Sequence, residues 1–267
     1  MTAVPILEAV DLVRDYRLPR GSLRGPAPVR HALRGVSLAI GPGERVGIVG
    51  ESGSGKTTLA RLLVGLDQPT TGDVRYQGRS IVGRRERDLR DLRSGVQIVF
   101  QDPMGSLDPR MTVGAIVAEP LVGLNAPGDH AARVAELLDA VGLPAGAARR
   151  YPHQFSGGQR QRIAVARALA PRPRVLVADE PVSALDVSVR AQVLNLLLDL
   201  ADELDLTVLF VSHDLSVVRF LCDRVAVLYQ GEIVESGPTE DVYGAPTHEY
   251  TQTLLAAVPR ITPSSSR

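Results

Sequence analysis

The sequence predicts an α/β fold built around a mostly parallel β-sheet. Short apolar runs that suit buried strands alternate along the chain with amphipathic segments of helical period. A glycine-rich loop at residues 50–55 separates a short core strand from the helix that follows it. The 267 residues suffice for one α/β domain with an additional lobe. Because crossover helices join parallel strands and cover both faces of the sheet, this alternation favours a sheet buried between helices.

Apolar runs bounded by turn residues mark the expected strands, and three- and four-residue apolar spacing marks the expected helices. The expected strands span Arg45–Val49, 73–76, 97–100, 175–178, 207–211, Arg224–Tyr229 and 232–234, the last two joined by a turn at Gln230 and Gly231. The expected helices span Lys56–Leu63, 84–95, 187–204 and 214–221, together with a helical stretch over 112–170. That stretch interrupts the series of core strands, which indicates a separate lobe. Residues 18–30 and 259–267 predict solvated segments, because the first is rich in Pro, Gly and Arg and the second in polar residues.

Composition argues against several classes of protein. Lys and Arg total 30 and Asp and Glu total 30, so the chain has no net basic field to hold a nucleic-acid backbone, and we expect no nucleic-acid partner. No run of 18 apolar residues predicts a membrane-spanning helix, and the first residues do not have the layout of a signal peptide. The single cysteine, Cys222, offers no disulfide and is expected to be a small buried side chain. We expect a cytoplasmic protein, free or docked on a membrane partner.

The glycine-rich loop fits the pattern G-x-x-x-x-G-K-[ST], from Gly50 to Thr57. Its three glycines allow successive backbone N–H groups to point inward at a helix N-terminus, which forms a binding site for phosphate. Lys56, the only lysine in the chain, is expected to neutralise the β- and γ-phosphates, and the Thr57 hydroxyl to bind Mg²⁺. The alternative is a chance glycine-rich turn, but the strand before it and the helix after it argue against that.

A second acidic element follows at the end of an apolar strand, in the stretch VLVADEP at 175–181. Asp179 at the strand tip is expected to hold Mg²⁺ through water, and Glu180 to polarise the attacking water as general base. An acidic turn at a strand end would be an ordinary feature by itself. Beside a phosphate loop it predicts a nucleoside triphosphatase.

The stretch FSGGQRQR at 155–162 predicts another phosphate-binding helix start. Ser156 is a good N-cap, and Gly157 and Gly158 leave the first helical N–H groups bare. One chain rarely needs two such sites. A dimer needs both, if the second helix start of one subunit caps the γ-phosphate held by the other.

Six motifs, in order and spacing, resemble the ATP-binding subunit of ABC transporters. They are Gly50–Thr58, Gln101, FSGGQ at 155–159, VADE at 177–180, SALD at 183–186 and His213. The resemblance implies a P-loop NTPase (RecA-like) core with a mostly parallel sheet, an N-terminal antiparallel β subdomain and an inserted α-helical subdomain. It also implies one domain over residues 1–267, with the nucleotide-binding core at 1–100 and 166–238, the helical subdomain at 101–165 and a C-terminal tail at 239–267.

The resemblance also assigns roles to residues. It implies that Glu180, Gln101 and His213 are catalytic, with Gln101 and His213 contacting the γ-phosphate. It also implies that residues 183–186 line the interface of a dimer. Metal ligation falls to Thr57, Gln101 and Asp179. The expected ATP contacts are Gly50, Glu51, Ser52, Gly53, Ser54, Gly55, Lys56, Thr57, Thr58, Ser156, Gly157, Gly158, Gln159 and Asp186. Tyr16 precedes the glycine loop and is the candidate to stack on adenine; the alternative is a plain packed tyrosine.

Finer matches at 97–113, 150–170, 179–197 and 246–259 are similar to the oligopeptide/dipeptide/nickel importer branch of that family. Phe155 replaces the leucine of the general signature, and the cysteine cluster of some members cannot exist in a chain with one cysteine. The implied partners are membrane permeases docked near 101–125, a second ATPase subunit, and indirectly an extracytoplasmic solute-binding protein. This places the subunit on the cytoplasmic face of the membrane, with ATP and Mg²⁺ as cofactors.

Other functions of the same nucleotide chemistry are less well supported. A ribosome-acting ABC ATPase would carry two such domains, and a chromosome-organising ATPase would separate its halves by a long coiled coil. A catalytically dead regulator would have lost Lys56, Glu180 or the signature, and none is lost. An exporter ATPase remains open, because only the importer-like stretches and the lack of a fused membrane domain argue against it. The cargo and the choice between homodimer and heterodimer also remain open.

Overall fold

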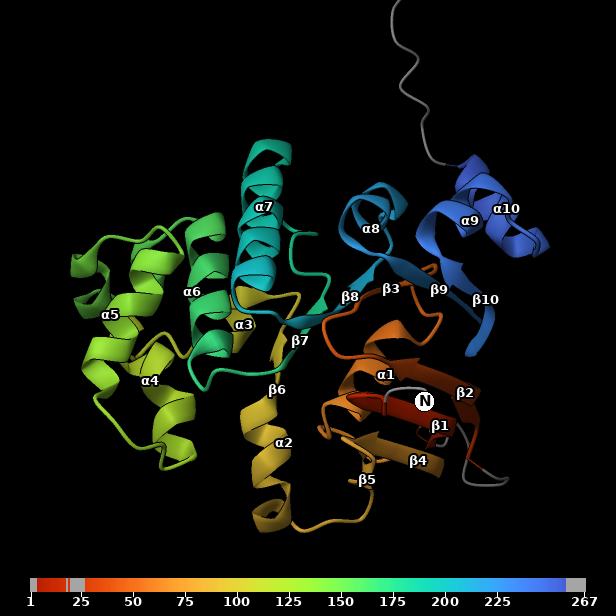
Figure 1. Cartoon of the computed structure of the whole chain (residues 1–267), viewed down its shortest axis with the longest axis horizontal. Helices are drawn as coiled ribbons and strands as arrows, with labels where there is room; N and C mark the ends of the chain where they lie inside the picture. The colour runs from red at the N-terminus through yellow and green to blue at the C-terminus, as the bar shows by residue number, and fades with distance from the viewer. Residues whose placement is uncertain (1–3, 18, 20–26, 258–267) are drawn as a thin grey trace, which may run out of the picture.

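The computed structural model describes residues 4–17, 19 and 27–257, arranged as two sheets surrounded by helices (Figure 1). A six-stranded sheet has the order β10-β9-β3-β8-β7-β6, and a four-stranded sheet has the order β2-β1-β4-β5. The strands of the larger sheet are β3 (Arg45–Val49), β6 (Val96–Val99), β7 (Val175–Asp179), β8 (Thr207–Ser212), β9 (Arg224–Tyr229) and β10 (Glu232–Pro238). Those of the smaller sheet are β1 (Leu7–Arg17), β2 (Val29–Ile40), β4 (Thr71–Tyr76) and β5 (Arg79–Ser80).

The larger sheet is parallel except at one edge. Neighbouring strands in the series β9-β3-β8-β7-β6 pair in parallel. Strand β10 alone in this sheet runs antiparallel, and it pairs with β9. Both faces are buried: Leu176 and Ala178 of β7 pack into one hydrophobic core, while Val175 and Val177 pack into another. Continuous apolar strands are what a sheet covered on both faces requires. The predicted mostly parallel sheet is therefore confirmed.

The smaller sheet is the predicted antiparallel β subdomain. In it β1 pairs antiparallel with both β2 and β4. Helix α1 (Lys56–Leu63) contributes Leu59, Leu62 and Leu63 to the core that this sheet shares with β3. That packing fixes the start of α1, and with it the glycine loop, between the two sheets.

The helical lobe comprises α4 (Val113–Gly123), α5 (His130–Ala140) and α6 (Gly157–Leu169), which lie together on one side of the molecule (Figure 1). The prediction of one helical stretch over 112–170 was wrong in its middle, where residues 141–156 form loops and the short 3₁₀ turns η2 (Ala145–Arg149) and η3 (Pro152–Gln154). Pro144 and Pro152 cannot continue an α-helix, because proline lacks the N–H and crowds the preceding turn. The suggested boundary between 165 and 166 falls inside α6.

Other helices were predicted with mixed success. The expected helix at 84–95 is a 3₁₀ turn, η1 (Glu86–Leu89), followed by α2 (Arg90–Gly95), and a short α3 (Pro103–Ser106) follows β6. The expected helices at 187–204 and 214–221 are α7 (Val187–Glu203) and α8 (Leu215–Leu221). Two further helices, α9 (Thr239–Gly244) and α10 (Glu249–Ala256), were not predicted. They place the start of the tail against the nucleotide-binding core.

Three smaller expectations can be compared with the described residues. Within them no helix is long and apolar enough to cross a bilayer. Cys222 is 7% exposed, as expected of a buried thiol, and burial raises its pKa to about 12. The predicted loop at 18–30 lies mostly outside the described residues, although its last two residues begin β2, and the predicted polar tail at 259–267 lies entirely outside them.

Candidate nucleotide-binding site

The glycine loop joins the end of β3 to the start of α1, and its glycines are required by close approaches of neighbouring backbone. Gly55 has a φ of 112°, and a Cβ there would lie 2.5 Å from the Ala32 carbonyl oxygen. A Cβ on Gly50 would lie 2.1 Å from the Leu228 carbonyl oxygen. The loop is thus pressed between β2 and the end of β9, and only glycine fits at these two positions.

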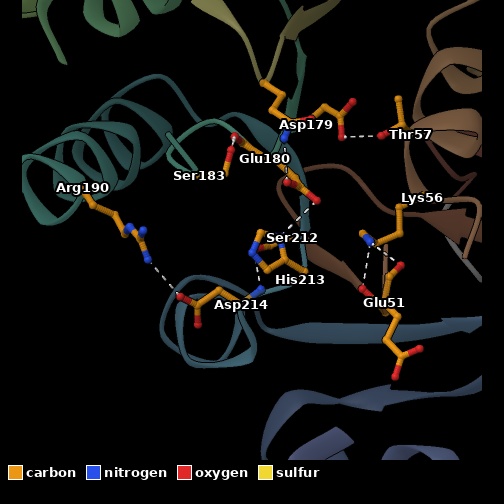
Figure 2. Close-up of polar contacts among 12 residues, drawn as sticks. Glu51, Lys56, Thr57, Asp179, Glu180, Ser183, Arg190, Ser212, His213 and Asp214 are labelled. Atoms are coloured by element: carbon orange, nitrogen blue, oxygen red, sulfur yellow. Dashed lines mark hydrogen bonds and ion pairs between the residues drawn. The ribbon is translucent and has the colours of Figure 1, made fainter. Parts of the chain in front are cut away.

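Lys56 is folded back into the loop (Figure 2). Its side chain is 5% exposed, and Nζ donates to the carbonyl oxygens of Gly50, at 2.8 Å, and Glu51, at 2.9 Å. Burial lowers the pKa of the Lys56 ammonium, while the carboxylates of Glu180, Asp179 and Glu51 oppose that shift. A buried ammonium held by two carbonyl dipoles is positioned to meet an anion that enters the loop.

Thr57 and Asp179 face one another across the junction of α1 and β7 (Figure 2). The Thr57 hydroxyl donates to Asp179 Oδ1 at 3.2 Å, and Asp179 is 3% exposed. Burial is the largest influence on the Asp179 carboxyl and raises its pKa, against the hydrogen bond from Thr57. Among the described residues, no group of three or more His, Cys, Asp or Glu side chains forms a metal cluster. A hydroxyl and a carboxylate at this distance fit Mg²⁺ if water and phosphate oxygens supply the remaining ligands.

Glu180, Gln101 and His213 converge beside this pair. Gln101 Nε2 donates to Glu180 Oε2 at 3.1 Å, and His213 Nδ1 lies 3.2 Å from Glu180 Oε1. Glu180 has a φ of 46°, an uncommon conformation for a residue with a side chain, and its N–H donates to the Val211 carbonyl at 2.8 Å. Such backbone strain costs on the order of 1 kcal/mol and is held by the surrounding sheet. The structure therefore brings the three predicted catalytic side chains together. Figure 2 shows Glu180 and His213 of this group.

These residues line one cavity of about 800 Å³. Its wall contains residues that the sequence predicted, which come from five separate parts of the chain, and residues that were not predicted. The predicted members are Tyr16, Gly50, Glu51, Ser52, Gly53, Gly55, Lys56, Thr57, Thr58, Gln101, Glu180 and His213. The unpredicted members are Arg30, Ala32, Arg61 and Leu254. Ser54 and Asp179, both buried, lie behind this surface.

Tyr16 reaches the cavity from β1. Its hydroxyl donates to Asp67 Oδ2 at 2.7 Å, and the Arg14 guanidinium lies over its ring at 4.5 Å from the centroid. Arg14 also pairs with Asp67 at 2.7 Å. This network fixes the ring at the cavity wall, and stacking on adenine stays a prediction.

The signature residues do not line this cavity. Ser156 and Gln159 form a capping box at the start of α6: the Ser156 hydroxyl accepts from the Gln159 N–H at 3.3 Å, and Gln159 Oε1 accepts from the Ser156 N–H at 3.0 Å. Gly157 is exposed, whereas Gly158 is buried, and a Cβ on Gly158 would lie 2.2 Å from Val189 Cγ1. Asp186 caps α7 by accepting from the Val189 N–H at 3.0 Å. In the single chain these residues cap and pack the starts of α6 and α7. Their contact with a nucleotide stays a prediction.

A family model described as "ABC transporter" matches residues 33–183, more than half of the chain. This match spans the glycine loop, the signature and the Asp179–Glu180 strand end. The chain belongs to the ABC transporter family. It is an ATPase of that family. A second model, described as "Oligopeptide/dipeptide transporter, C-terminal region", matches residues 234–267.

Relatives of this ABC ATPase extend over nearly its whole length. It is 48% identical over 266 residues to the dipeptide transport ATP-binding protein DppF of Haemophilus influenzae, a match that covers 98% of this chain and 81% of that protein. It is also 48% identical over 264 residues to the glutathione import ATP-binding protein GsiA of Pectobacterium atrosepticum. That match covers 98% of this chain and 42% of GsiA. Both names describe ATP-binding proteins, one of dipeptide transport and one of glutathione import.

Solved structures of ABC ATPases have the same fold. The ATP-binding cassette MJ0796, solved as a dimer in a post-hydrolysis state with ADP and Pi, is similar with a TM-score of 0.77 and 32% identity, covering 87% of this chain and 98% of that one. CbiO1 of Clostridium perfringens, part of the ABC transporter complex cbiONQ, has a TM-score of 0.75 and 27% identity, covering 91% and 92%. The predicted P-loop ATPase core is confirmed by these likenesses.

The unpredicted cavity residues come from positions without a local motif. Arg30 lies on β2 within the segment expected to be solvated loop, Arg61 on α1, and Leu254 on α10. Arg61 could have been found from its position one turn after Lys56 and Thr57 on the same helix. Arg30 and Leu254 reach the cavity only through long-range packing, for which no sequence signal exists.

Proposed function

We propose that this ABC ATPase powers the import of peptides, or of a related small solute such as nickel, through separate membrane permeases. The observation that carries the proposal is the match of residues 234–267 to the oligopeptide/dipeptide C-terminal region, a segment outside the general nucleotide-binding motifs. The names of the dipeptide transport and glutathione import relatives support the same cargo class. The relatives named as peptide import and glutathione import ATP-binding proteins favour uptake over export.

The catalytic unit that we propose is a dimer. The glycine loop of one subunit would hold ATP, and Ser156, Gly157, Gly158 and Gln159 of the other would cap its γ-phosphate, with Asp186 at the seam. Support comes from the signature residues that lie outside the cavity of their own chain, and from the dimeric state in which MJ0796 was solved. The partner subunit is either a second copy or a related ATPase.

The chemistry within each site follows from side-chain placement. Glu180 would polarise the attacking water, while Gln101 and His213, both at Glu180, would hold its carboxylate in place and contact the γ-phosphate. Lys56 would neutralise phosphate charge, and Thr57, Asp179 and Gln101 would hold Mg²⁺. When bound, Mg²⁺ would neutralise negative charge on the phosphates.

The partners and the location follow from the importer assignment. Permeases would dock near residues 101–125, the segment that links Gln101 to α4, so that a change at Gln101 could reach the membrane. The cargo would arrive from an extracytoplasmic solute-binding protein, and the ATPase would lie on the cytoplasmic face of the membrane. Peptides and nickel complexes are distinguished by the binding protein and the permeases.

Co-purification tests this function. A Glu180→Gln subunit, loaded with ATP to hold the closed dimer, would be extracted gently from membranes of the native host, and its companions would be identified by mass spectrometry. Two multi-span permeases, with or without a second ATPase, are expected, and the associated binding protein would then be screened with di- and oligopeptides, glutathione and nickel. Recovery of soluble partners alone would refute the transporter assignment and favour a soluble ABC ATPase.

A further inference from the structure

The C-terminal helix α10 touches the glycine loop. The Tyr250 hydroxyl oxygen accepts a hydrogen bond from the Glu51 N–H at 3.0 Å, a contact between residues 199 positions apart. Leu254, one turn further along α10, lines the nucleotide cavity. The segment that matches the peptide-transporter C-terminal region is therefore part of the wall of the ATP site.

The backbone of Glu51 makes several of the contacts that hold the glycine loop. Its carbonyl oxygen accepts from Lys56 Nζ at 2.9 Å and from the Ser54 N–H at 3.2 Å. Tyr250 holds the N–H of the same residue. A hydroxyl that fixes the Glu51 backbone thus restrains both the loop turn and the carbonyl on which the Lys56 ammonium rests.

Tyr250 is itself firmly held. Its ring stacks on that of Tyr229, with centroids 4.0 Å apart and an angle of 28° between the planes, and Tyr229 ends strand β9 beside β3. The Tyr250 N–H donates to His248 Nδ1 at 3.1 Å, which caps the start of α10. Burial raises the pKa of the Tyr250 hydroxyl, so it is un-ionised at neutral pH.

The start of α10 is anchored to β10 by a single carboxylate. Glu235 accepts from the Thr247 N–H at 2.7 Å, from the Thr247 hydroxyl at 2.9 Å and from the His248 N–H at 3.1 Å. Tyr250 therefore sits on a helix that is fixed to the sheet at its N-terminal end. A rigid support of this kind is what a positioning residue needs.

We propose that Tyr250 is a positioning residue for the glycine loop, through which the C-terminal helix sets the affinity of this ATPase for ATP. The inference rests on the nucleotide site described above, and it gives the C-terminal segment a role in nucleotide binding besides any role in transport. The hydroxyl acts through Glu51 on the loop; it is not assigned a contact with phosphate.

Tyr250→Phe removes the hydroxyl and keeps the stacked ring, and Tyr229→Phe is the matched control. The Tyr229 hydroxyl accepts from Gln230 Nε2 at 3.0 Å, within its own turn, and Tyr229 does not line the cavity. In the full chain, Tyr250→Phe is expected to weaken ATP binding by about 2- to 10-fold, the worth of one neutral hydrogen bond. The KM for ATP should rise by the same factor with kcat within about twofold of wild type, while Tyr229→Phe leaves both unchanged.

Calorimetric titration with ATP, steady-state hydrolysis and thermal melting without nucleotide separate the outcomes. A merely structural role would lower the melting temperature of Tyr250→Phe and leave its KM for ATP unchanged, which would overturn the proposal. Equal shifts in both variants would also overturn it. ATP binding by the wild type and by a Lys56→Ala reference is measured first. If the wild type binds ATP and Lys56→Ala does not, an unchanged ATP affinity in Tyr250→Phe refutes this inference alone. If the wild type does not bind ATP, the nucleotide site is refuted as well.

Discussion

Two helix starts in this chain have the composition of a phosphate-binding site, and the structure treats them differently. At α1 the loop is enclosed by its own chain: Lys56 is buried, Gly50 and Gly55 are pressed against backbone, and a cavity of about 800 Å³ opens in front of them. At α6 the first residues Ser156 and Gly157 are exposed, and the capping box satisfies the helix start with its own side chains. The first site is a cavity lined by residues of its own chain, whereas the second is an exposed surface that does not line that cavity.

The comparison teaches that similar local chemistry does not by itself make a complete site. The start of α1 already carries Lys56 and Thr57, and it gains the carboxylates of Asp179 and Glu180 because β3, β8 and β7 end side by side in the parallel sheet. Ligands commonly bind at the carboxyl ends of such strands. Helix α6 belongs to the helical lobe (Figure 1), and its start packs against Leu185 and Val189.

The largest expected effect tests whether the site at α1 carries out ATP hydrolysis. Glu180→Gln should lower ATP turnover by roughly 10²–10⁴, the usual worth of a general base, because the amide cannot accept the proton of the attacking water. ATP binding should persist, since Lys56 and the loop are untouched, and the closed dimer should accumulate. Turnover is measured by phosphate release and the dimer by size-exclusion chromatography with ATP. Wild-type turnover in this variant would contradict the role of Glu180.

Tyr16 tests whether the α1 site also recognises the base. Tyr16→Ala is expected to weaken ATP binding by roughly 5- to 100-fold, the range that the loss of one aromatic stacking partner produces. Tyr16→Phe is the control, since it keeps the ring and loses only the hydroxyl that donates to Asp67 at 2.7 Å. A packed tyrosine without contact to the base would change the melting temperature in both variants and leave ATP affinity at the wild-type value.

The glycines of the α6 start can be separated by their surroundings. A Cβ on Gly158 would lie 2.2 Å from Val189 Cγ1, whereas on Gly157 the nearest atom is Leu185 Cδ2 at 3.4 Å. Gly158→Ala should therefore reduce the free energy of unfolding by about 1–3 kcal/mol through overpacking, and Gly157→Ala should leave it almost unchanged. Urea unfolding measures both. A proposed dimer role for the exposed glycine would appear in Gly157→Ala as slower ATP turnover at wild-type stability.

The smallest effect concerns the anchor of α10. Burial disfavours the Glu235 carboxylate, but the hydrogen bonds from Thr247 and His248 outweigh it and lower the pKa of Glu235 from 4.5 to about 2. A depressed pKa stabilises the folded state above the unfolded value and loses that effect as pH falls from about 4.5 towards 2. Glu235→Gln should therefore lower the melting temperature by a few degrees at pH 7 and by less at pH 3. Equal shifts at both pH values would show that the charge of Glu235 contributes nothing.

The sequence predicted the parts of the site that are contiguous along the chain. Gly50–Thr58 and Asp179–Glu180 could be found because their residue spacing and the strands beside them indicate a phosphate loop and an acidic strand end. The structure brings these two segments together with Gln101 and His213. It predicted helix ends poorly between residues 141 and 156, where Pro144 and Pro152 divide the lobe into short turns. Helical periodicity alone does not reveal such interruptions when the flanking helices share one apolar pattern.

By itself, then, the amino-acid sequence determined the strands of the larger sheet, the phosphate loop and the family of this ATPase, because these depend on short motifs and apolar runs along the chain. Only the tertiary structure decided that Tyr250 meets Glu51, that Leu254 and Arg30 line the cavity at the glycine loop, and that the signature residues lie outside it. Contacts between segments as much as 199 residues apart arise from the packing of α10 on the sheet. That packing depends on the summed shape and polarity of many side chains, so no local pattern encodes it.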